Sequence, residues 1–195
     1  MTVLRDENPT ATIEIQLRAF QLDPTAPLDG RQPVREAYAR RFGGEESATQ
    51  IIDRVSGVAR TVGIDFAMHR AIRANTQRAH RLLKLVQATK PDLQMAVNES
   101  VMRAYFSEGR NVADLPTLTA CAERAGFATQ SLADDIANDD PASPLVVAVK
   151  NDLDWCRERD VSSVPTLVVD GTFQIPGAQE PATLVRFLRR LSRGM

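Results

Sequence analysis

The stretch TLVVDG, Thr166 to Gly171, constrains the fold of this chain more than any other. Its first four residues are apolar or β-branched without a break, which is typical of a strand covered on both faces. Asp170-Gly171 then predicts a tight hairpin turn, because glycine accepts the positive φ that such a turn requires. The following residues alternate, with Phe173 and Ile175 inward, so we predict a two-stranded hairpin near the C-terminus.

A long helical block precedes this hairpin, because apolar residues recur at helical spacing from about Val34 to Arg159. Glycines mark two expected helix ends, Gly63 and Gly126, and Asp114 is a predicted N-cap. The expected helices are Glu46–Val62, Asn75–Thr89, Asp92–Phe106, one that starts at Asp114, Thr129–Ala137 and Ser143–Glu158.

One strand and one helix flank these elements. Thr12 to Phe20 alternates in polarity, which predicts a half-buried strand, and Pro181 to Leu191 predicts a final amphipathic helix. The order of elements indicates a small α/β unit with an inserted helical subdomain. We therefore assign residues 1–30 and 160–195 to the α/β domain and residues 31–159 to the helical insertion.

The net charge and the N-terminal sequence argue against several classes of protein. A net charge of −1 favours neither nucleic acid nor an anionic membrane, and no apolar run approaches the roughly 20 residues of a membrane span. The first ten residues contain no apolar segment of a secretory signal, so we expect a cytoplasmic protein. The two cysteines, Cys121 and Cys156, are too far apart to form a disulfide framework. We expect either small buried thiols or a redox-sensing thiol.

Four blocks of sequence resemble a known family. The chain resembles the FrnE-like branch of the DsbA family of thioredoxin-fold oxidoreductases, which is related to the glutathione transferase kappa and 2-hydroxychromene-2-carboxylate isomerase group. The blocks, which occur in the family's order, are AFQLDPTAP, NTQRAHRL, RAYFSEGRNVAD and SVPTLVVDGTFQIPGAQ.

The resemblance implies a thioredoxin-like sheet of the DsbA type with a large inserted helical subdomain. In the family, the proline matching Pro165 forms a cis peptide bond with the residue matching Val164, and it lies beside a CxxC motif where substrate pairs with the backbone. The kappa relatives bind glutathione near the same proline and at the turn matching Gly177, Ala178 and Gln179. The substrates expected from the resemblance are thiol or disulfide peptides and proteins, or glutathione.

The sequence departs from the family at its start. No CxxC is present among the 195 residues, and MTVLRDENPTAT matches the tail of the family's first helix and the loop after it. The family's reactive thiolate needs a helix N-terminus to lower its pKa, and a second cysteine resolves the mixed disulfide. We therefore expect no catalytic residue in this chain, and neither cysteine replaces the missing pair.

The missing first strand would lie at the centre of the family's sheet. Without it, the Thr12–Phe20 strand and the Thr166–Val169 strand have no common neighbour. Three explanations stay open: the chain is truncated, which we favour; the two strands pair directly; or another chain, in a homodimer or otherwise, supplies a strand.

Two polar residues at the start of one predicted helix have competing roles. Asn75 is either a helix N-cap or a contact for glutathione, and His80 is either a buried hydrogen-bonding residue or part of the cleft lining. His69 lies eleven residues before His80, which is not the spacing of a shared metal site, so we expect no metal. Similarly, the turn at Gly177–Gln179 either redirects the chain or forms a nest of amides for an anion.

Three functional hypotheses follow. The first is a thiol–disulfide oxidoreductase of which this chain carries only the proline side of the site and is redox-inactive by itself. The second is a degenerate thioredoxin-like protein that binds peptide or glutathione. The third is a kappa-type glutathione-dependent isomerase or transferase.

Overall fold

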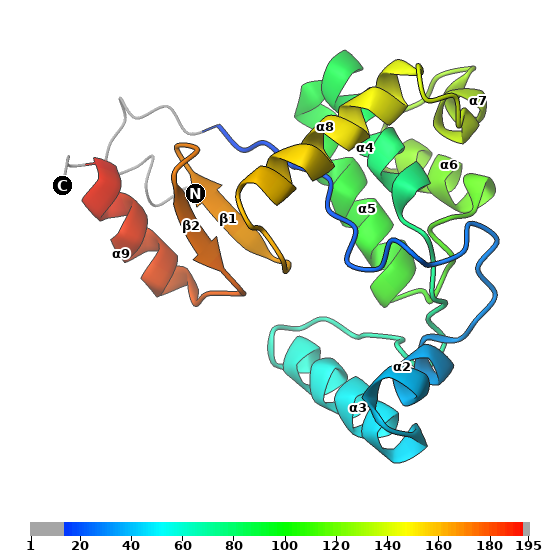
Figure 1. The fold of residues 1–195 in the computed structure, drawn as a ribbon, viewed down its shortest axis with the longest axis vertical. Coiled ribbons are helices and arrows are strands. Elements are labelled where there is room, and N and C mark those ends of the chain that lie inside the picture. Colours follow the sequence, from blue (N-terminus) through cyan, green and yellow to red (C-terminus); the bar gives the residue numbers. More distant parts are fainter. Residues whose placement is uncertain (1–13, 193–195) are drawn as a thin grey trace.

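The computed structural model describes residues 14–192, and its elements form three groups in space (Figure 1). One group is a pair of helices, α2 (Val34–Phe42) and α3 (Glu45–Thr61). The second group contains α4 (Gln77–Thr89), the 3₁₀ helix η1 (Pro91–Leu93), α5 (Gln94–Phe106), α6 (Leu115–Arg124), α7 (Leu132–Ala137) and α8 (Pro144–Glu158). The third group contains the strands β1 (Thr166–Val169) and β2 (Phe173–Pro176) and the helix α9 (Pro181–Ser192).

The main core lies among α4, α5, α6 and α7. Its largest side chains, including Leu82, Val97, Leu118 and Phe127, are fully removed from solvent. Leu82, Val97 and Leu118 come from different helices, and Phe127 lies in the loop after α6, so the helical spacing brings apolar faces together around this ring. Burial of these apolar side chains is the dominant favourable contribution to the stability of the helical group.

The predicted helices of this block are confirmed, most closely where a capping signal marks their ends. Asp114 precedes α6, and its carboxylate accepts a hydrogen bond from the Thr117 amide at 3.1 Å. Gly63 and Gly126 follow α3 and α6 with φ of 77° and 80°, the left-handed conformation that glycine adopts at little cost. The helix expected to begin at Thr129 starts later, at Leu132.

A second, smaller core attaches the α2–α3 pair to the rest of the molecule. Val34, Ile52, Met68 and Ala71 are buried there. The ring of Phe66 stacks on that of Phe106 at the end of α5, with their centroids 4.8 Å apart. The base of the helix pair is therefore packed against α5, while its tip extends away from the other helices (Figure 1).

The hairpin is confirmed, but its burial is not as predicted. β1 and β2 are antiparallel, with Val169 opposite Phe173. Asp170 and Gly171 in the turn both have positive φ, 50° and 68°. Leu167 is 39% exposed, so the expectation of a strand covered on both faces is wrong. The physical reason is that, within residues 14–192, β1 has only β2 as a strand neighbour.

The strand predicted at Thr12–Phe20 is wrong for its described part, because residues 14–20 have no strand structure. Side chains of helices, instead of a neighbouring strand, satisfy the backbone here. The Ala19 amide donates to the Asp152 carboxylate at 2.8 Å, and the Phe20 carbonyl oxygen accepts from His80 at 3.1 Å. Thr12, Ile13 and the proposed match of residues 1–12 to a family helix lie outside the described residues.

None of the helices within residues 14–192 is both long enough and apolar enough to span a membrane.

Candidate functional site

The Pro165 loop, residues Ser163 to Thr166, leads into β1 at an exposed position. The Val164–Pro165 peptide bond is cis. Val164 is 50% exposed and Pro165 is exposed as well. The Thr166 hydroxyl donates to the Ser163 carbonyl at 2.8 Å, which closes the loop on itself. The loop therefore presents an apolar surface and its backbone to solvent.

The turn after β2 lies directly beside this loop. The Gly177 amide donates to the Pro165 carbonyl at 2.8 Å, and Gly177 has a φ of 76°. The Gln179 side chain donates to the Pro176 carbonyl at 2.9 Å, and Ala178 and Gln179 are exposed. Five of the predicted site residues are therefore brought together, namely Val164, Pro165, Gly177, Ala178 and Gln179. None of the five carries an acid, a base or a thiol, so this surface can bind a ligand but supplies no reacting group.

Asn75 does not join this cluster. It is buried, and its side-chain oxygen accepts from the amide of Gln77, the first residue of α4, at 2.9 Å. The N-cap of α4 is Thr76, so the alternative of an N-cap at Asn75 is wrong by one residue. Its amide nitrogen donates to the Ala26 carbonyl at 2.7 Å, and its side-chain oxygen also accepts from the Gln21 side chain at 3.4 Å. Asn75 thus fastens the 21–26 loop to α4, and its predicted contact with a ligand stays a prediction.

His80 also holds the N-terminal segment. Its Nε2 lies 3.1 Å from the Phe20 carbonyl oxygen, and since that oxygen can only accept, Nε2 carries the proton. Burial lowers the pKa of His80 from its ordinary 6.5, although the hydrogen bond to Phe20 acts in the opposite direction. A neutral imidazole with a filled donor fits a structural role, and its participation in a cleft stays a prediction.

The two cysteines are buried free thiols, as one of the two expectations had it. Cys121 lies in α6 with its Sγ 3.6 Å from the Ser100 carbonyl oxygen, and Cys156 lies in α8 with its Sγ 3.7 Å from that of Ala19. Burial raises the pKa of both thiols, and the Asp152 carboxylate adds to the rise at Cys156. Thiols of this kind are poor nucleophiles at neutral pH.

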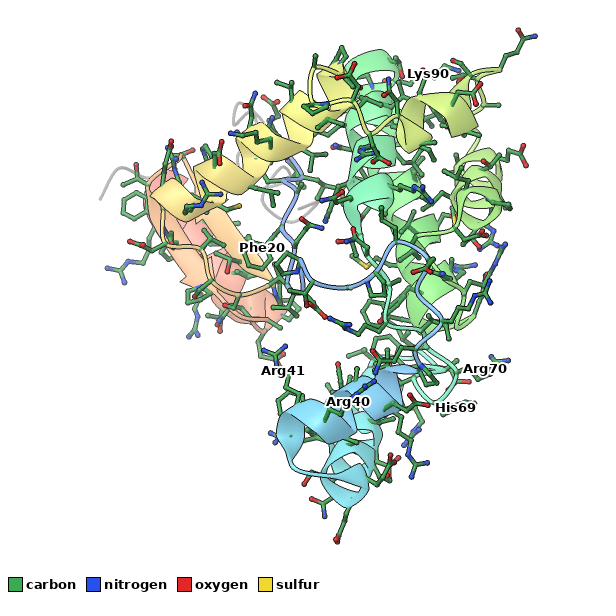
Figure 2. All side chains as sticks on the ribbon, turned by 45° about the vertical axis from the view of Figure 1, so that its right-hand side comes forward. Phe20, Arg40, Arg41, His69, Arg70 and Lys90 are labelled. Atoms are coloured by element: carbon green, nitrogen blue, oxygen red, sulfur yellow. The ribbon has the colours of Figure 1, made fainter. Side chains whose placement is uncertain are left out.

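An apolar groove separates the N-terminal segment from the end of α8. It has a volume of about 280 Å³ and lies next to Val161, a few residues before the Pro165 loop. Phe20 forms one side of the groove. Figure 2 shows Phe20 between the helices and the hairpin. Leu153 and Cys156 form the opposite side, and Arg157 lies at the rim. Phe20 is therefore part of the groove wall.

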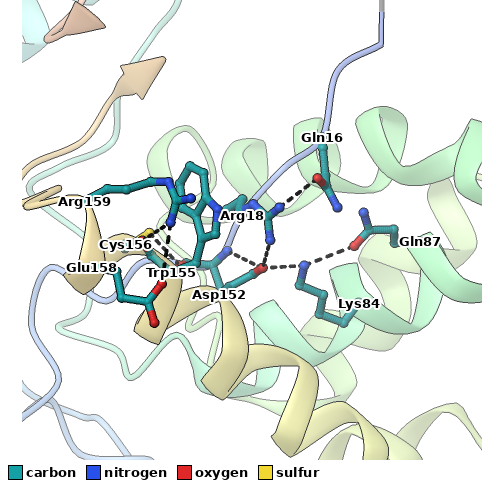
Figure 3. A network of polar contacts seen from close by, with 10 residues as sticks. Gln16, Arg18, Lys84, Gln87, Asp152, Trp155, Cys156, Glu158 and Arg159 are labelled. Carbon is teal, nitrogen blue, oxygen red and sulfur yellow. Dashed lines mark hydrogen bonds and ion pairs between the residues drawn. The ribbon is translucent and has the colours of Figure 1, made fainter. Parts of the chain in front are cut away.

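A buried carboxylate holds the wall of this groove in place (Figure 3). Asp152 is 2% exposed and forms ion pairs with Arg18, at 2.8 Å, and with Lys84. It also accepts the Ala19 amide, as described above. The Arg18 guanidinium covers one ring of Trp155 at 4.5 Å from the centroid. A buried acid with two cationic partners is fully compensated, so it fixes the segment that ends at Phe20.

Sequence reasoning did not single out Asp152, although a signal was present. Val149, Asp152 and Cys156 share one helical face of α8, and Val149 and Cys156 are buried as that face predicts. An acid at a position where the pattern requires an apolar residue indicates a buried ion pair. Lys84, one of only three lysines, occupies a buried position of α4.

In the part of the chain that the structure describes, no three histidine, cysteine, aspartate or glutamate side chains are grouped so that they could hold a metal ion.

Comparisons with known proteins match this geometry to one group. A family model described as DSBA-like thioredoxin domain matches residues 1–189. The fold is similar to that of a probable DsbA oxidoreductase from Streptomyces coelicolor, with a TM-score of 0.80 and 24% identity over 91% of this chain and 75% of that one. It is also similar to a candidate protein disulfide isomerase from Nitrosomonas europaea, with a TM-score of 0.60 and 18% identity over 77% and 76% of the two chains. No curated protein matches the sequence.

Proposed function

This chain belongs to the family of DsbA-like thioredoxin domains, and on that premise we propose that it forms the proline-bearing wall of a thiol–disulfide exchange cleft of the FrnE-like type. In this proposal the 195 residues bind the substrate peptide but do not supply the reactive pair of thiols. The predicted thioredoxin-like fold of the DsbA type is confirmed by the family match and by the fold similarity.

The observation that carries the proposal is the pairing of the Pro165 loop with the Gly177 turn. The 2.8 Å hydrogen bond between them makes one exposed surface of Val164, Pro165, Ala178 and Gln179. A surface without titratable groups can recognise an extended peptide through its backbone and through apolar contact. This supports a substrate-binding role and leaves the bond exchange to another group.

The state of the thiols supports the second half of the proposal. Disulfide exchange requires a thiolate that a substrate can reach. Cys121 and Cys156 are both buried, lie in different helices and have raised pKa values. Neither thiol therefore meets the requirement, and the sequence contains no CxxC.

The outer edge of β1 supports the proposal that a further strand pairs with it. Residues 165 and 177, 167 and 175, and 169 and 173 are the hydrogen-bonded pairs of the hairpin, so the amides and carbonyls of Thr166 and Val168 point to the opposite edge. Within residues 14–192 no strand covers that edge. We propose that a strand from another polypeptide segment pairs here and places its own reactive group next to Pro165.

An insulin-reduction assay tests the thiol half of the proposal. With dithiothreitol as the reductant, we expect the 195-residue chain to precipitate insulin no faster than dithiothreitol alone, and the Cys121→Ser/Cys156→Ser variant to behave identically. Acceleration by the chain that this double substitution abolishes would overturn the proposal, because the chain would then contain its own reactive thiols.

A peptide-binding assay tests the other half of the proposal, that the surface around Pro165 binds substrate. We expect a fluorescent, S-alkylated cysteine peptide to bind saturably, and Pro165→Ala to weaken binding about fivefold or more, because the loop loses apolar contact. Pro116→Ala is the matched control, since Pro116 is an exposed proline at the distant start of α6. If S-methylglutathione binds instead, with the same dependence on Pro165, the ligand is glutathione. If neither probe binds, the proposal is wrong.

A further inference from the structure

Four aliphatic residues follow one another along α3 at spacings of four, three and four, namely Ile51, Val55, Val58 and Val62. This is the spacing of a stripe along one side of a helix. The buried Ile52 of α3 belongs to the second core instead. Val55, Val58 and Val62 are 39%, 63% and 69% exposed. The aliphatic stripe therefore lies beside the core face and has no cover within residues 14–192.

Three residues of the stripe, Val55, Val58 and Val62, together with Ala59 form one side of a surface groove with a volume of about 350 Å³. The returning segment after α3 forms the other side through Ile64 and Phe66. Phe66 is held by its stacking on Phe106, so this wall belongs to the packed second core. Figure 2 shows the α2–α3 pair, with Arg40 and Arg41 on α2, extending from the remaining helices. The groove is thus a formed apolar channel, whereas single exposed valines would need no explanation.

One charge lines this groove. Arg54 belongs to its lining and has no ion pair and no hydrogen bond among the described side chains. Most other cations on the helices do have partners, such as Arg35 with Glu45 on the same helix pair. An uncompensated guanidinium beside an apolar channel selects for a carboxylate on whatever occupies the channel.

Area and charge argue against a second copy of this chain as the occupant. A stable dimer buries about 800 Å² on each partner, which is more than these few aliphatic side chains can provide. The amphipathic helix of a second copy, α9, carries Arg186 and Arg190 on its exposed side, so it would place cations next to Arg54. A single acidic helix from another protein needs a smaller contact area than a dimer does, and it places carboxylates, not cations, next to Arg54.

We propose that this groove docks an amphipathic helix of another protein, with aliphatic anchors in the channel and an acidic residue next to Arg54. A helix whose anchors recur at i, i+4, i+7 and i+11 matches the stripe on α3 turn by turn. The groove lies on a different helix pair from the Pro165 loop, so a helix bound there leaves the proposed substrate surface free. This inference is independent of the proposed function.

Fluorescence anisotropy with two synthetic helical peptides tests the proposal. Both peptides have leucines at the anchor positions, and their flanks carry glutamates in one and lysines in the other. We expect saturable binding of the glutamate peptide and at least tenfold weaker binding of the lysine peptide. Val58→Ser and Val62→Ser should each weaken binding of the glutamate peptide about tenfold, whereas Val147→Ser, at a 40% exposed valine of α8, should not change it.

A charge reversal separates docking from general stickiness. Arg54→Glu should exchange the preference, so that the lysine peptide binds more tightly than the glutamate peptide. Equal binding of both peptides to both proteins, or binding that Val58→Ser leaves unchanged, would overturn the proposal. It would equally be overturned if neither peptide binds, or if sedimentation shows a dimer that Val58→Ser dissociates, because a second copy would then cover the stripe.

Discussion

The helices α4–α7 and the C-terminal β1–β2–α9 unit have similar apolar patterning but very different burial. In the helical core, Leu82, Val97 and Leu118 of the helices and Phe127 of the loop after α6 are fully buried. In the C-terminal unit, no described side chain is buried, and Leu167 and the adjoining Val164 are among the exposed large apolar residues. The comparison teaches that apolar pattern specifies a face but that burial also requires a neighbouring element to cover it.

The same comparison separates stability from function in this molecule. The helical region closes its own core and satisfies its buried charges. The C-terminal unit presents the Pro165 loop and an open strand edge, and these are the surfaces that binding would use. Regions of low burial open locally at a lower free energy than a core does. The C-terminal unit, which is proposed to bind substrate, is therefore also expected to be less protected from amide hydrogen exchange than the helical core.

The largest expected effect contrasts one phenylalanine from each region. Phe127→Ala removes a fully buried ring, so we expect a loss of about 3–5 kcal/mol in the free energy of unfolding, measured with urea. Phe173→Ala removes a half-buried ring that meets Phe187 edge-on at 6.3 Å, so the loss should stay under about 2 kcal/mol. Equal losses for the two variants would break the comparison, because the C-terminal unit would then have a core of comparable strength.

The next effect concerns the charge that joins the N-terminal segment to the helices. Asp152→Ala leaves the buried Lys84 ammonium and the Arg18 guanidinium without their common partner. We expect a loss of about 3 kcal/mol in the free energy of unfolding. Asp154→Asn, at an acid two residues away that pairs with Lys150 and Arg157 on the surface, is the control and should change stability little. A similar loss in both variants would contradict the assignment.

A smaller effect should appear on acidification near neutrality. Because burial lowers the pKa of His80, the unfolded chain binds a proton at its ordinary pKa of 6.5 before the folded chain does. Stability should therefore decline as the pH falls below about 6.5. His80→Gln, which keeps a donor for the Phe20 carbonyl, should remove this part of the decline in urea unfolding at a series of pH values. If the slope survives the substitution, His80 is not its source.

The smallest effect concerns the loop that precedes α2. The hydrogen bond from Arg73 lowers the pKa of Asp23 from 3.8 to about 2. A lowered carboxyl pKa contributes stability above pH 3.8, and this contribution disappears as the pH falls towards 2. Because the pair is partly exposed, Asp23→Asn should cost under about 1 kcal/mol at pH 7. The difference between wild type and variant should vanish near pH 2, and a difference that persists there would point to packing instead.

Much of the fold could be predicted because local signals coincide with the elements. The β1–β2 turn follows Asp170-Gly171, and α6 follows Asp114, since in each case a residue satisfies a backbone requirement within a few positions. The predicted strand ending at Phe20 failed for the opposite reason. Its alternating pattern was present, but a strand also needs a partner, and side chains of α4 and α8 satisfy this backbone instead.

The candidate site was predicted in part for the same physical reason. Pro165 and Gly177 lie close together because the hairpin register forces them to, so a sequence that specifies the hairpin also specifies their contact. His80 was placed in the right helix and Asn75 lies two residues before its start, but their partners lie some fifty to sixty residues earlier in the chain. Contacts across such separations depend on tertiary packing, which the local pattern does not encode.

The position of Trp155 has a practical consequence. It is the only tryptophan of the chain, and its ring lies between the guanidinium groups of Arg18 and Arg159, at 4.5 and 4.3 Å from the ring centroid. Its intrinsic emission therefore depends on whether the chain around Arg18 is seated on α8. Detachment of that segment should shift the emission spectrum without any added label, so the protein contains its own optical probe of this junction.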